Sequence, residues 1–520
     1  SLTAIPQSLF QIEALRKVDC DACHSLTSPP LALCKQGIKA VRKYFYDLKV
    51  EKGSNQLLIP VTVIGKSRAG KTSLVQSVKK SKRVLTNRDT EEGKIDAATK
   101  VFKVVEAEVS DVRKLIFTDF GGHNIYHVSY QLTFKTQSVP LLVIDIAEFD
   151  KLANKNGVES ASQELCIDWL SHLYLSCPRL QRPIVALTHS DQVTEECLKH
   201  RRQQLIEVTE QIRVNIIQTE QKFAYAKNPI LTMTSFADLT NPLISDNNIM
   251  TFSDISTESD IDALKAALTD AGSGMVTELP GSWYRQLLKI TEQKDKSYIE
   301  LSDINKEFPE DEEHVVLEYL HDAGSIMWYK NIVPLSNIVF HRADVLIHLI
   351  QVLYNHTQDD EWEKRLNNFK EFVSNGKSVG KEKYTAMIDN FKDTGVMEGT
   401  LLLNLLKIES QELPTNIALE ILKTFHLLYR CGPPDAPASC QKYIFPYFAK
   451  RTITAPNVHT HLTPLKVDLL LCGLPVPTYV FSLITAAYLG MNSSPENYPE
   501  VGENGAIVRN ENGLIKYLIH

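Results

Sequence analysis

The sequence predicts an α/β protein in which a doubly wound, six-stranded, mostly parallel sheet is followed by an α+β region. Between residues 57 and 268, short apolar runs alternate with helical segments, a pattern typical of a parallel sheet covered by helices on both faces. The first apolar run leads directly into a glycine-rich loop. The length of 520 residues exceeds what one hydrophobic core usually organises. It therefore predicts about two to four domains.

Apolar runs locate the strands and the main helices of this pattern. Six strands are expected at Leu57–Ile64, Val101–Val109, Lys114–Phe120, Pro140–Ile146, Ile184–Thr188 and Pro229–Thr234. A charged helix is expected near Glu195–Gln221, with its core positions at Leu205, Val208, Ile212 and Ile216. Another amphipathic helix is expected at Leu33–Leu48, before the first strand.

Composition and charge narrow the class of protein. Hydrophobic residues make up 43% and charged residues 23% of the chain, values that are ordinary for a soluble globular protein. A net charge of -7 gives no overall field for nucleic acid, so no nucleic-acid partner is expected. The nine scattered cysteines are an odd number, which favours reduced thiols in the cytoplasm over a disulfide framework. The start at Ser1 carries no signal peptide, and we expect a fragment of a longer protein.

One uncharged stretch, Leu469–Pro495, is long enough to span a bilayer. Gly473, Pro475 and Pro477 interrupt it near its start, and several polar residues follow. A strand, a turn and a buried helix are therefore favoured over a membrane span.

The first residues of the chain contain a repeat-like segment. Leu15-Arg-Lys-Val-Asp-Cys-Asp-Ala-Cys23 fits the leucine-rich-repeat template L-x-x-L-x-L-x-x-N/C, with Cys23 at the asparagine position. Residues 1–50 are therefore expected to be the end of a leucine-rich array plus a linker helix. The alternative for Cys20-x-x-Cys23-His24 is a haem attachment or half of a zinc site, with Cys34 as the nearest further thiol.

The strongest motif follows the first predicted strand. Gly65-Lys-Ser-Arg-Ala-Gly-Lys-Thr72 satisfies G-x-x-x-x-G-K-[ST] between a strand and a helix, which is the context that a P-loop requires. Its glycines let the loop wrap around phosphates, and its backbone N–H groups hold the negative charge. Lys71 is expected to bridge the β and γ phosphates, and the Thr72 hydroxyl to ligate Mg²⁺. The predicted phosphate-binding residues are Gly65, Ser67, Arg68, Ala69, Gly70, Lys71, Thr72 and Ser73.

Two residues in this loop stand where Ras-like proteins usually carry glycine. Ser67 adds bulk beside the γ-phosphate, which leaves less room for an arginine delivered by an activating protein. Arg68 is either a solvated charge or a contact to the nucleotide or to a partner.

Two later motifs favour guanine as the base. Asp119-Phe-Gly-Gly122 matches D-x-x-G, in which Asp119 holds Mg²⁺ through water and the Gly122 amide senses the γ-phosphate. Thr188-His-Ser-Asp191 stands after the fifth strand, where GTPases carry N/T-K-x-D. The Asp191 carboxylate can accept two hydrogen bonds from guanine N1 and N2, a donor pair that adenine lacks. His189 replaces the lysine that normally lies along the base. The alternatives are a helix cap and, if Asp191 fails to meet the base, an ATPase.

Further positions complete the predicted site. Thr90 is the expected switch threonine that closes over Mg²⁺ and the γ-phosphate, with Thr86 and Thr99 as competitors. Thr234-Ser235 is expected to present a backbone N–H to the guanine carbonyl, in a register uncertain by one residue. His123 stands where Ras carries a glutamine, and it either orients the attacking water or is a surface bystander. His127 is expected to be structural.

Segments beyond the predicted GTPase domain give the chain a family resemblance. Together with the leucine-rich tail and the Thr188-His189 departure from N-K-x-D, they resemble the Roco family of Roc–COR proteins. The matching segments are Leu279–Trp283, Val316–Gly324, Pro334-Leu335, Ile338-Val339 and Pro475–Ile484, the last resembling the P-x-x-L-F-x-x-L element of the second COR half.

The resemblance implies a Roc GTPase domain of Ras-like fold at residues 51–275, followed by COR halves at 276–400 and 401–520. It implies a switch in a multidomain cytoplasmic signalling protein, with GTP as substrate, GDP as product and Mg²⁺ as cofactor. Lys71, Thr90 and His123 would serve catalysis, and Thr72, Thr90 and Asp119 would hold the metal. A homodimer through COR and protein partners through the leucine-rich repeats are expected. The alternative is a nucleotide-binding scaffold with little turnover.

Overall fold

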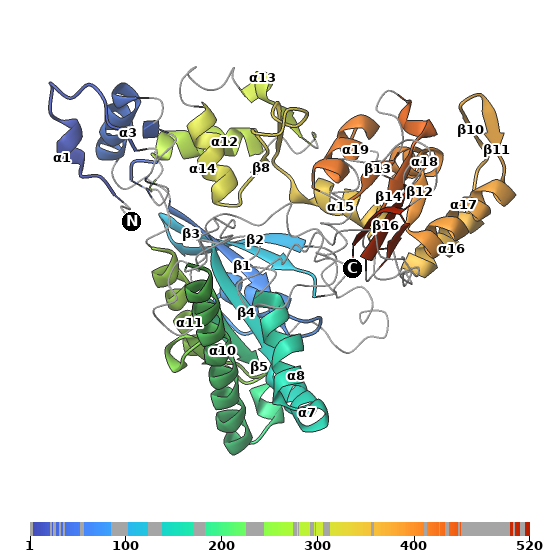
Figure 1. Ribbon diagram of the computed structural model, residues 1–520. Coiled ribbons are helices and arrows are strands. Elements are labelled where there is room, and N and C mark those ends of the chain that lie inside the picture. The colour runs from blue at the N-terminus through green and yellow to red at the C-terminus, as the bar shows by residue number, and fades with distance from the viewer. Residues whose placement is uncertain are drawn as a thin grey trace. The chain divides into compact units, whose positions relative to one another are not determined.

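In the computed structural model the chain folds into two compact units (Figure 1). Along the chain, the first unit ends at Val345 and the second continues from Leu346. The structure describes residues 4–20, 23, 26, 28–30, 33–34, 37–51, 57–84, 102–122, 138–170, 182–224, 244–273, 278, 280–291, 296, 298–304, 313–354, 358–409, 413–425, 427–431, 436–445, 448, 500–502, 505–509 and 515–519. The boundary between the units falls within the region that the sequence assigned to the first COR half.

The first unit is built on the predicted six-stranded sheet. Its strands are β1 (Leu57–Ile64), β2 (Phe102–Ser110), β3 (Arg113–Phe120), β4 (Val139–Asp145), β5 (Ile184–Thr188) and β6 (Ile249–Thr251). They lie in the order β2-β3-β1-β4-β5-β6, and only β2 runs antiparallel to its neighbour. The doubly wound, mostly parallel sheet and the positions of its first five strands are therefore confirmed.

The last described strand of the sheet lies later in the chain than the sixth predicted strand. β6 pairs in parallel with β5, with Val185 opposite Ile249. β6 was not predicted from the sequence, and the strand that was expected at Pro229–Thr234 lies outside the described residues. β6 has only three residues, and its place is set by pairing with β5, so it has little signal of its own in the sequence.

Helices cover both faces of this sheet (Figure 1). They are α4 (Lys71–Lys80), α7 (Ile146–Asn156), α8 (Val158–Ser162), the π-helical turn η2 (Gln163–Ile167), α10 (Glu195–Ala224), the short turn η4 (Asp246–Asn248) and α11 (Glu258–Gly272). Ile59, Val61 and Val63 of β1 share a buried cluster with residues of α4 and α11. On α10, Leu205 is buried and Val208 is half-buried, in agreement with the prediction.

A second cluster joins the beginning of β1 and β3 to two helices that precede β1 and to two that follow the nucleotide-binding motifs. These helices are α1 (Gln7–Phe10), α3 (Ile38–Val50), α12 (Gly281–Thr291) and α14 (Glu313–Asp322). Leu58 of β1 and Ile116 of β3 are buried together with Tyr44 and Trp283. The Leu58 N–H donates a hydrogen bond of 3.2 Å to the hydroxyl of Tyr319, a residue of α14. The start of the sheet is thus bonded to the region that follows the nucleotide-binding motifs.

The N-terminal segment packs against this second cluster. Phe10, Cys20 and Leu26 are buried in it, and Leu15 and Val18 are half-buried. The predicted linker helix is observed as α3, which begins after Gly37 because that residue has a φ of 103°. Among the described residues no three His, Cys, Asp or Glu side chains lie together in a way that could hold a metal ion. The leucine-rich-repeat assignment stays a prediction.

The first unit also contains a small sheet. Its strands are β7 (Ile299–Glu300), β9 (Ile338–Phe340) and β8 (Met327–Trp328), and α13 (Leu301–Ile304) follows β7. Gly324, with a φ of 79°, makes the turn between α14 and β8. α15 (Ala343–Leu353) crosses the boundary between the two units.

The second unit has its own aromatic core. Its elements are α16 (Gln358–Asn367), β10 (Phe372–Ser374), β11 (Lys377–Val379), α17 (Lys381–Thr394), β12 (Val396–Glu398), α18 (Gly399–Glu409), α19 (Thr415–Thr424), β13 (Tyr429–Cys431), η5 (Ala438–Cys440), β14 (Lys442–Ile444), β15 (Glu500–Gly502), β16 (Gly505–Arg509) and β17 (Ile515–Ile519). Tyr354 stacks on Phe448, and Phe391 meets Phe445 and Phe448 edge to face. No described helix is long and apolar enough to cross a membrane, and Leu469–Pro495 lies outside the described residues.

The hydroxyl of Tyr319 gives a testable measure of how strongly β1 depends on α14. Replacement of Tyr319 by Phe leaves the buried Leu58 N–H without its acceptor, which is expected to lower the free energy of unfolding by about 1–3 kcal/mol. Urea denaturation followed by circular dichroism measures the change. Tyr46→Phe is the matched control, because Tyr46 is 65% exposed. Equal midpoints for both variants would show that the Tyr319 hydroxyl contributes nothing.

Candidate functional site

The predicted motifs meet at the edge of the sheet where the parallel strands end, which is the usual position of ligand sites in such sheets. The loop between β1 and α4 begins at Gly65, with a φ of 138°. A Cβ at Gly65 would lie 2.1 Å from the Val143 carbonyl oxygen, so only glycine fits. Gly70, with a φ of 85°, precedes the first residue of α4. The backbone of this loop therefore has the tight path that a P-loop needs.

The D-x-x-G motif touches the P-loop directly. The Ser67 N–H donates a hydrogen bond of 3.0 Å to the Gly122 carbonyl. A Cβ at Gly122 would lie 2.2 Å from the Ser67 nitrogen, so the close approach of the two loops requires glycine. Arg68 is exposed and has a φ of 67°, whereas Ala69 is buried. The structure therefore brings the two predicted phosphate-binding loops together.

Lys71 lies inside the P-loop and is only 5% exposed. Its Nζ donates hydrogen bonds of 2.6 Å to the Gly65 carbonyl and 2.8 Å to the Lys66 carbonyl. Burial lowers the pKa of Lys71 to about 8, against the opposing effect of the nearby Asp119 carboxylate. A buried ammonium with two neutral acceptors is suited to an anionic ligand, which would stabilise its charged form.

The predicted metal ligands lie side by side. The Thr72 hydroxyl donates a hydrogen bond of 2.6 Å to Oδ2 of Asp119. Asp119 is fully buried at the end of β3. A hydroxyl and a carboxylate in contact are the oxygen ligands that Mg²⁺ prefers, so the residues present fit this ion. Ser73 lies in the first turn of α4, where its carbonyl accepts a hydrogen bond of 2.7 Å from the Ser77 hydroxyl.

Thr188 connects the base-reading motif to the P-loop. Its hydroxyl donates a hydrogen bond of 2.8 Å to the Ala69 carbonyl and lies 3.2 Å from the Ile144 carbonyl. The side chain is buried, and a Cβ at Gly70 would lie 3.5 Å from its methyl group. A threonine at this position therefore ties the end of β5 to the loop that follows β1.

His189 is turned towards the end of β4. It has a φ of 56° and is 5% exposed, and its Nδ1 lies 2.9 Å from Oδ2 of Asp145. Oδ1 of Asp145 accepts the N–H groups of Ala147 and Glu148, each at 3.0 Å, and so caps α7. Burial raises the pKa of Asp145, but its hydrogen bonds to His189 and to these amides outweigh burial and lower it. The sequence argument missed Asp145, although a carboxylate at the end of a parallel strand was a usable signal.

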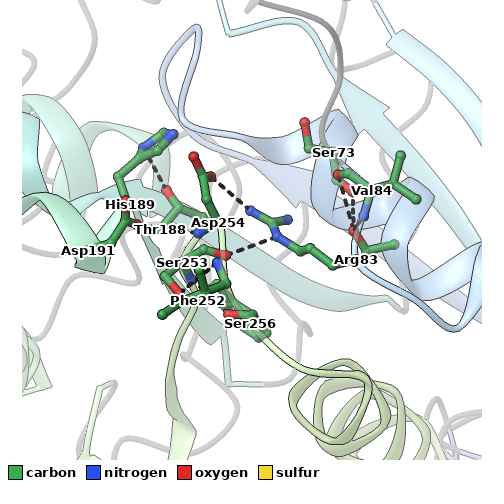
Figure 2. A network of polar contacts seen from close by, with 12 residues as sticks. Ser73, Arg83, Val84, Thr188, His189, Asp191, Phe252, Ser253, Asp254 and Ser256 are labelled. Atoms are coloured by element: carbon green, nitrogen blue, oxygen red, sulfur yellow. Dashed lines mark hydrogen bonds and ion pairs between the residues drawn. The ribbon is translucent and has the colours of Figure 1, made fainter.

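Asp191 lies exposed in the short turn η3 (Ser190–Gln192). Its Oδ1 accepts a hydrogen bond of 3.4 Å from the backbone N–H of Asp254 (Figure 2). The Ser190 N–H and hydroxyl bond the Phe252 carbonyl at 3.2 Å and 3.1 Å. The segment that follows the last strand, Phe252–Asp254, thus flanks the predicted base-reading carboxylate.

Four predicted site residues are not among those that the structure describes. They are Thr90, His123, Thr234 and Ser235. The competing positions Thr86 and Thr99 and the structural His127 also lie outside the described residues. The segment that follows the last described strand of the sheet, β6, is Phe252–Asp254. The roles of Thr90 and His123 stay predictions.

The sequence argument also missed an ion-pair cluster beside the P-loop. Nζ of Lys66 lies 2.6 Å from Oε1 of Glu148 on α7 and 2.5 Å from Oε1 of Glu164 in η2. Partial burial lowers the pKa of Lys66, but its hydrogen bonds to the two carboxylates outweigh burial and raise it. This cluster holds the second residue of the loop against two helical elements.

Comparison with known proteins agrees with this geometry. Residues 60–191 match the family described as the Ras of Complex, Roc, domain of DAPkinase. This segment includes the P-loop and the D-x-x-G motif and ends at Asp191. No curated protein matches the chain. Residues 60–191 are therefore similar to a Roc domain, and the sheet that contains them has a Ras-like fold.

Similar solved structures include a Roco protein and two elongation factors. Methanosarcina barkeri Roco2 RocCORdC bound to GDP aligns with a TM-score of 0.44 at 16% identity, over 76% of this chain and 97% of that chain. A bacterial selenocysteine-specific elongation factor EF-Sec aligns with a TM-score of 0.26 at 16% identity, over 41% of this chain and 28% of that chain. Translation elongation factor SelB from Methanococcus maripaludis, in complex with the GTP analogue GppNHp, aligns with a TM-score of 0.24 at 15% identity, over 42% of this chain and 35% of that chain. Because all three TM-scores are low, the proposed function rests on the Roc match and on the geometry of the site instead.

The Thr188 hydroxyl provides a direct test of the site geometry. Thr188→Val keeps the shape of the side chain but removes the donor to Ala69, so the P-loop is held less firmly. We expect GDP affinity to fall about tenfold, which corresponds to about 1.4 kcal/mol. Thr188→Ser retains the donor and is the matched control, with near-normal affinity. Calorimetric titration with GDP measures both, and normal binding by the valine variant would contradict the expectation.

Proposed function

We propose that this protein is a guanine-nucleotide switch of the Roc–COR type, which binds GTP with Mg²⁺ and hydrolyses it slowly. The observation that carries the proposal is the junction of three motifs at one sheet edge. Ser67 bonds the D-x-x-G loop, Thr188 bonds the P-loop, and Asp191 lies exposed beside the segment after β6. This arrangement supports binding of both ends of a nucleotide.

The phosphate side of the site is supported by charge and backbone. Lys71 would place its ammonium against the β and γ phosphates, and the loop amides before α4 would hold the remaining charge. Thr72 and Asp119 would hold Mg²⁺, which when bound neutralises charge that develops on the phosphates. Arg68 is exposed at the loop and is available for a contact to nucleotide or partner.

The base side is supported by the exposed carboxylate of Asp191, which would accept the N1 and N2 donors of guanine. The His189 side chain contacts Asp145, so it is oriented differently from a motif lysine that lies along the base. The Ser253 and Asp254 N–H groups donate to the Ser256 hydroxyl and to Asp191. We therefore keep the backbone donor to the guanine carbonyl at Thr234-Ser235.

Replacement of Asp191 tests the proposal most directly. An asparagine cannot accept both guanine donors, but its amide can donate to the C2 carbonyl of xanthine. Asp191→Asn should therefore lower the preference for GDP over ADP and raise the affinity for xanthosine diphosphate, with phosphate binding retained. Calorimetric titrations with the three diphosphates measure this. An unchanged GDP-over-ADP ratio would refute the base assignment. Lys71→Ala is the comparison, because it should abolish binding of all three.

Turnover depends on His123, which we propose orients the attacking water, with Thr90 closing over Mg²⁺. Its replacement by alanine should slow single-turnover GTP hydrolysis by about tenfold or more, and it should leave GDP affinity nearly unchanged. Quenched-flow measurement of phosphate release checks this. Equal rates would make His123 a bystander, and undetectable hydrolysis by the unaltered protein would favour the nucleotide-binding scaffold.

The remaining parts of the proposal rest on the sequence resemblance. Residues 276–400 and 401–520 would form the COR halves and carry a homodimer contact, and residues 1–50 would end a leucine-rich array that binds protein partners. A cytoplasmic signalling role follows from the same resemblance. Light scattering of the chain with GDP and with a non-hydrolysable GTP analogue tests the dimer, and a monomer at all concentrations in both states would exclude it.

A further inference from the structure

We propose that Arg83 positions the base-reading carboxylate Asp191 through a single peptide unit, the one between Ser253 and Asp254. This inference rests on the proposed function of Asp191. Arg83 lies just beyond the end of α4, the helix that follows the P-loop, whereas the peptide unit follows β6. Figure 2 shows the Arg83 side chain extending toward Ser253 and Asp254, with Thr188, His189 and Asp191 beyond them.

The backbone on both sides of Arg83 is fixed to the last turns of α4. The helix ends at Lys80, and the Lys82 N–H donates a hydrogen bond of 3.2 Å to the Ser77 carbonyl. The Val84 N–H donates a hydrogen bond of 2.9 Å to the Ser77 hydroxyl, which is itself fully buried. Arg83 therefore starts from an anchored backbone, which reduces the conformational entropy lost when its side chain is ordered.

The side chain of Arg83 binds the peptide unit at its carbonyl end. Nε donates a hydrogen bond of 3.0 Å to the Ser253 carbonyl. A terminal guanidinium nitrogen lies 3.7 Å from Oδ1 of Asp254, and the arginine side chain is only 15% exposed. The planar guanidinium offers donors in a rigid fork, so one side chain can hold the carbonyl and approach the carboxylate together.

The opposite end of the same peptide unit faces Asp191. The Ser253 carbonyl and the Asp254 N–H belong to one trans peptide, in which the two groups point in opposite directions. Arg83 and, at 3.3 Å, the Ser256 N–H both donate to the carbonyl, and the Asp254 N–H donates to Oδ1 of Asp191 at 3.4 Å. If this peptide rotated, a carbonyl would replace the N–H beside the carboxylate and repel it. Arg83 therefore helps to fix the orientation of this peptide in which the Asp254 N–H donates to Asp191.

The consequence is specific to the base. A carboxylate that is held by the Asp254 N–H still has acceptor sites for two guanine donors, because each ionised oxygen has two lone pairs. Without Arg83, Asp191 would be less well ordered, and the guanine 2-amino group would contribute less to binding. Simple loss of a positive charge would instead weaken all nucleoside diphosphates in similar proportion.

The test compares GDP with inosine diphosphate, whose base keeps N1–H but lacks the 2-amino group. We expect the GDP-over-IDP affinity ratio of Arg83→Ala to fall about tenfold, the effect of about one charge-assisted hydrogen bond. Arg83→Lys keeps the charge but not the fork, so its ratio should lie between those of the alanine variant and the unaltered protein. Calorimetric titrations of the full chain with both diphosphates give the ratio.

Two further variants separate the possible causes. Lys82→Ala removes the same charge from an exposed neighbouring side chain and should leave the ratio unchanged. Asp254→Asn keeps the backbone N–H and should change the ratio less than Arg83→Ala, because the closer anchor of Arg83 is the Ser253 carbonyl. Thermal melting is recorded for each, and the lysine variant gives the answer if the alanine variant fails to fold.

Some outcomes overturn the inference, and others overturn the function on which it rests. Equal proportional losses of GDP and IDP affinity in Arg83→Ala, or a ratio retained in both arginine variants, would reject a positioning role. A fall in the ratio for Lys82→Ala as large as for Arg83→Ala would reject it as well. An unaltered protein that binds ADP as tightly as GDP would instead reject the proposed guanine specificity.

Discussion

The hydrogen bond from the Thr188 hydroxyl to the Ala69 carbonyl is the interaction on which the nucleotide site depends. It joins the end of β5 to the loop after β1, across β4, whose Ile144 carbonyl lies 3.2 Å from the same hydroxyl. Parallel strands end at one edge, so a short side chain can make this connection only there. The predicted phosphate-binding and base-reading motifs, which are far apart in the sequence, are thereby held next to each other.

The ion pairs around this junction restrict the positions of the loops more than they stabilise the fold. His189 with Asp145, Lys66 with two glutamates and Arg83 with Asp254 each join a motif residue, or a residue close to one, to a neighbouring element. Lys66 and Asp254 are partly exposed, and exposed ion pairs contribute little to stability. Their effect is to restrict where a loop can lie. The change from a motif lysine to His189 fits this arrangement, because the imidazole reaches the carboxylate that caps α7.

Local signals explain why so much of this site could be predicted from the sequence. The P-loop, the D-x-x-G turn and Asp191 each follow a strand whose apolar run is visible in the sequence, so their common edge followed from the parallel order. β6 was not predicted because it has three residues and is defined by pairing with β5. Asp145 and Arg83 were missed for a related reason, since their roles depend on partners 44 and 170 positions away in the chain.

The same strand that ends in the P-loop begins at a contact with the region after the Roc match. The Leu58 N–H bonds the Tyr319 hydroxyl, and every residue of β1 from Leu58 to Ile64 is buried. A buried strand in mid-sheet moves as a rigid element, because its hydrogen bonds and its packing resist bending. We infer that β1 is the most direct connection by which the P-loop and α14 can affect each other. Such coupling is reciprocal. If a rearrangement of the Tyr319 contact changes nucleotide affinity, nucleotide binding must shift the equilibrium of that rearrangement by the same factor. Coupling also requires two distinct arrangements of that contact, because nucleotide cannot shift an equilibrium if the strand has only one arrangement.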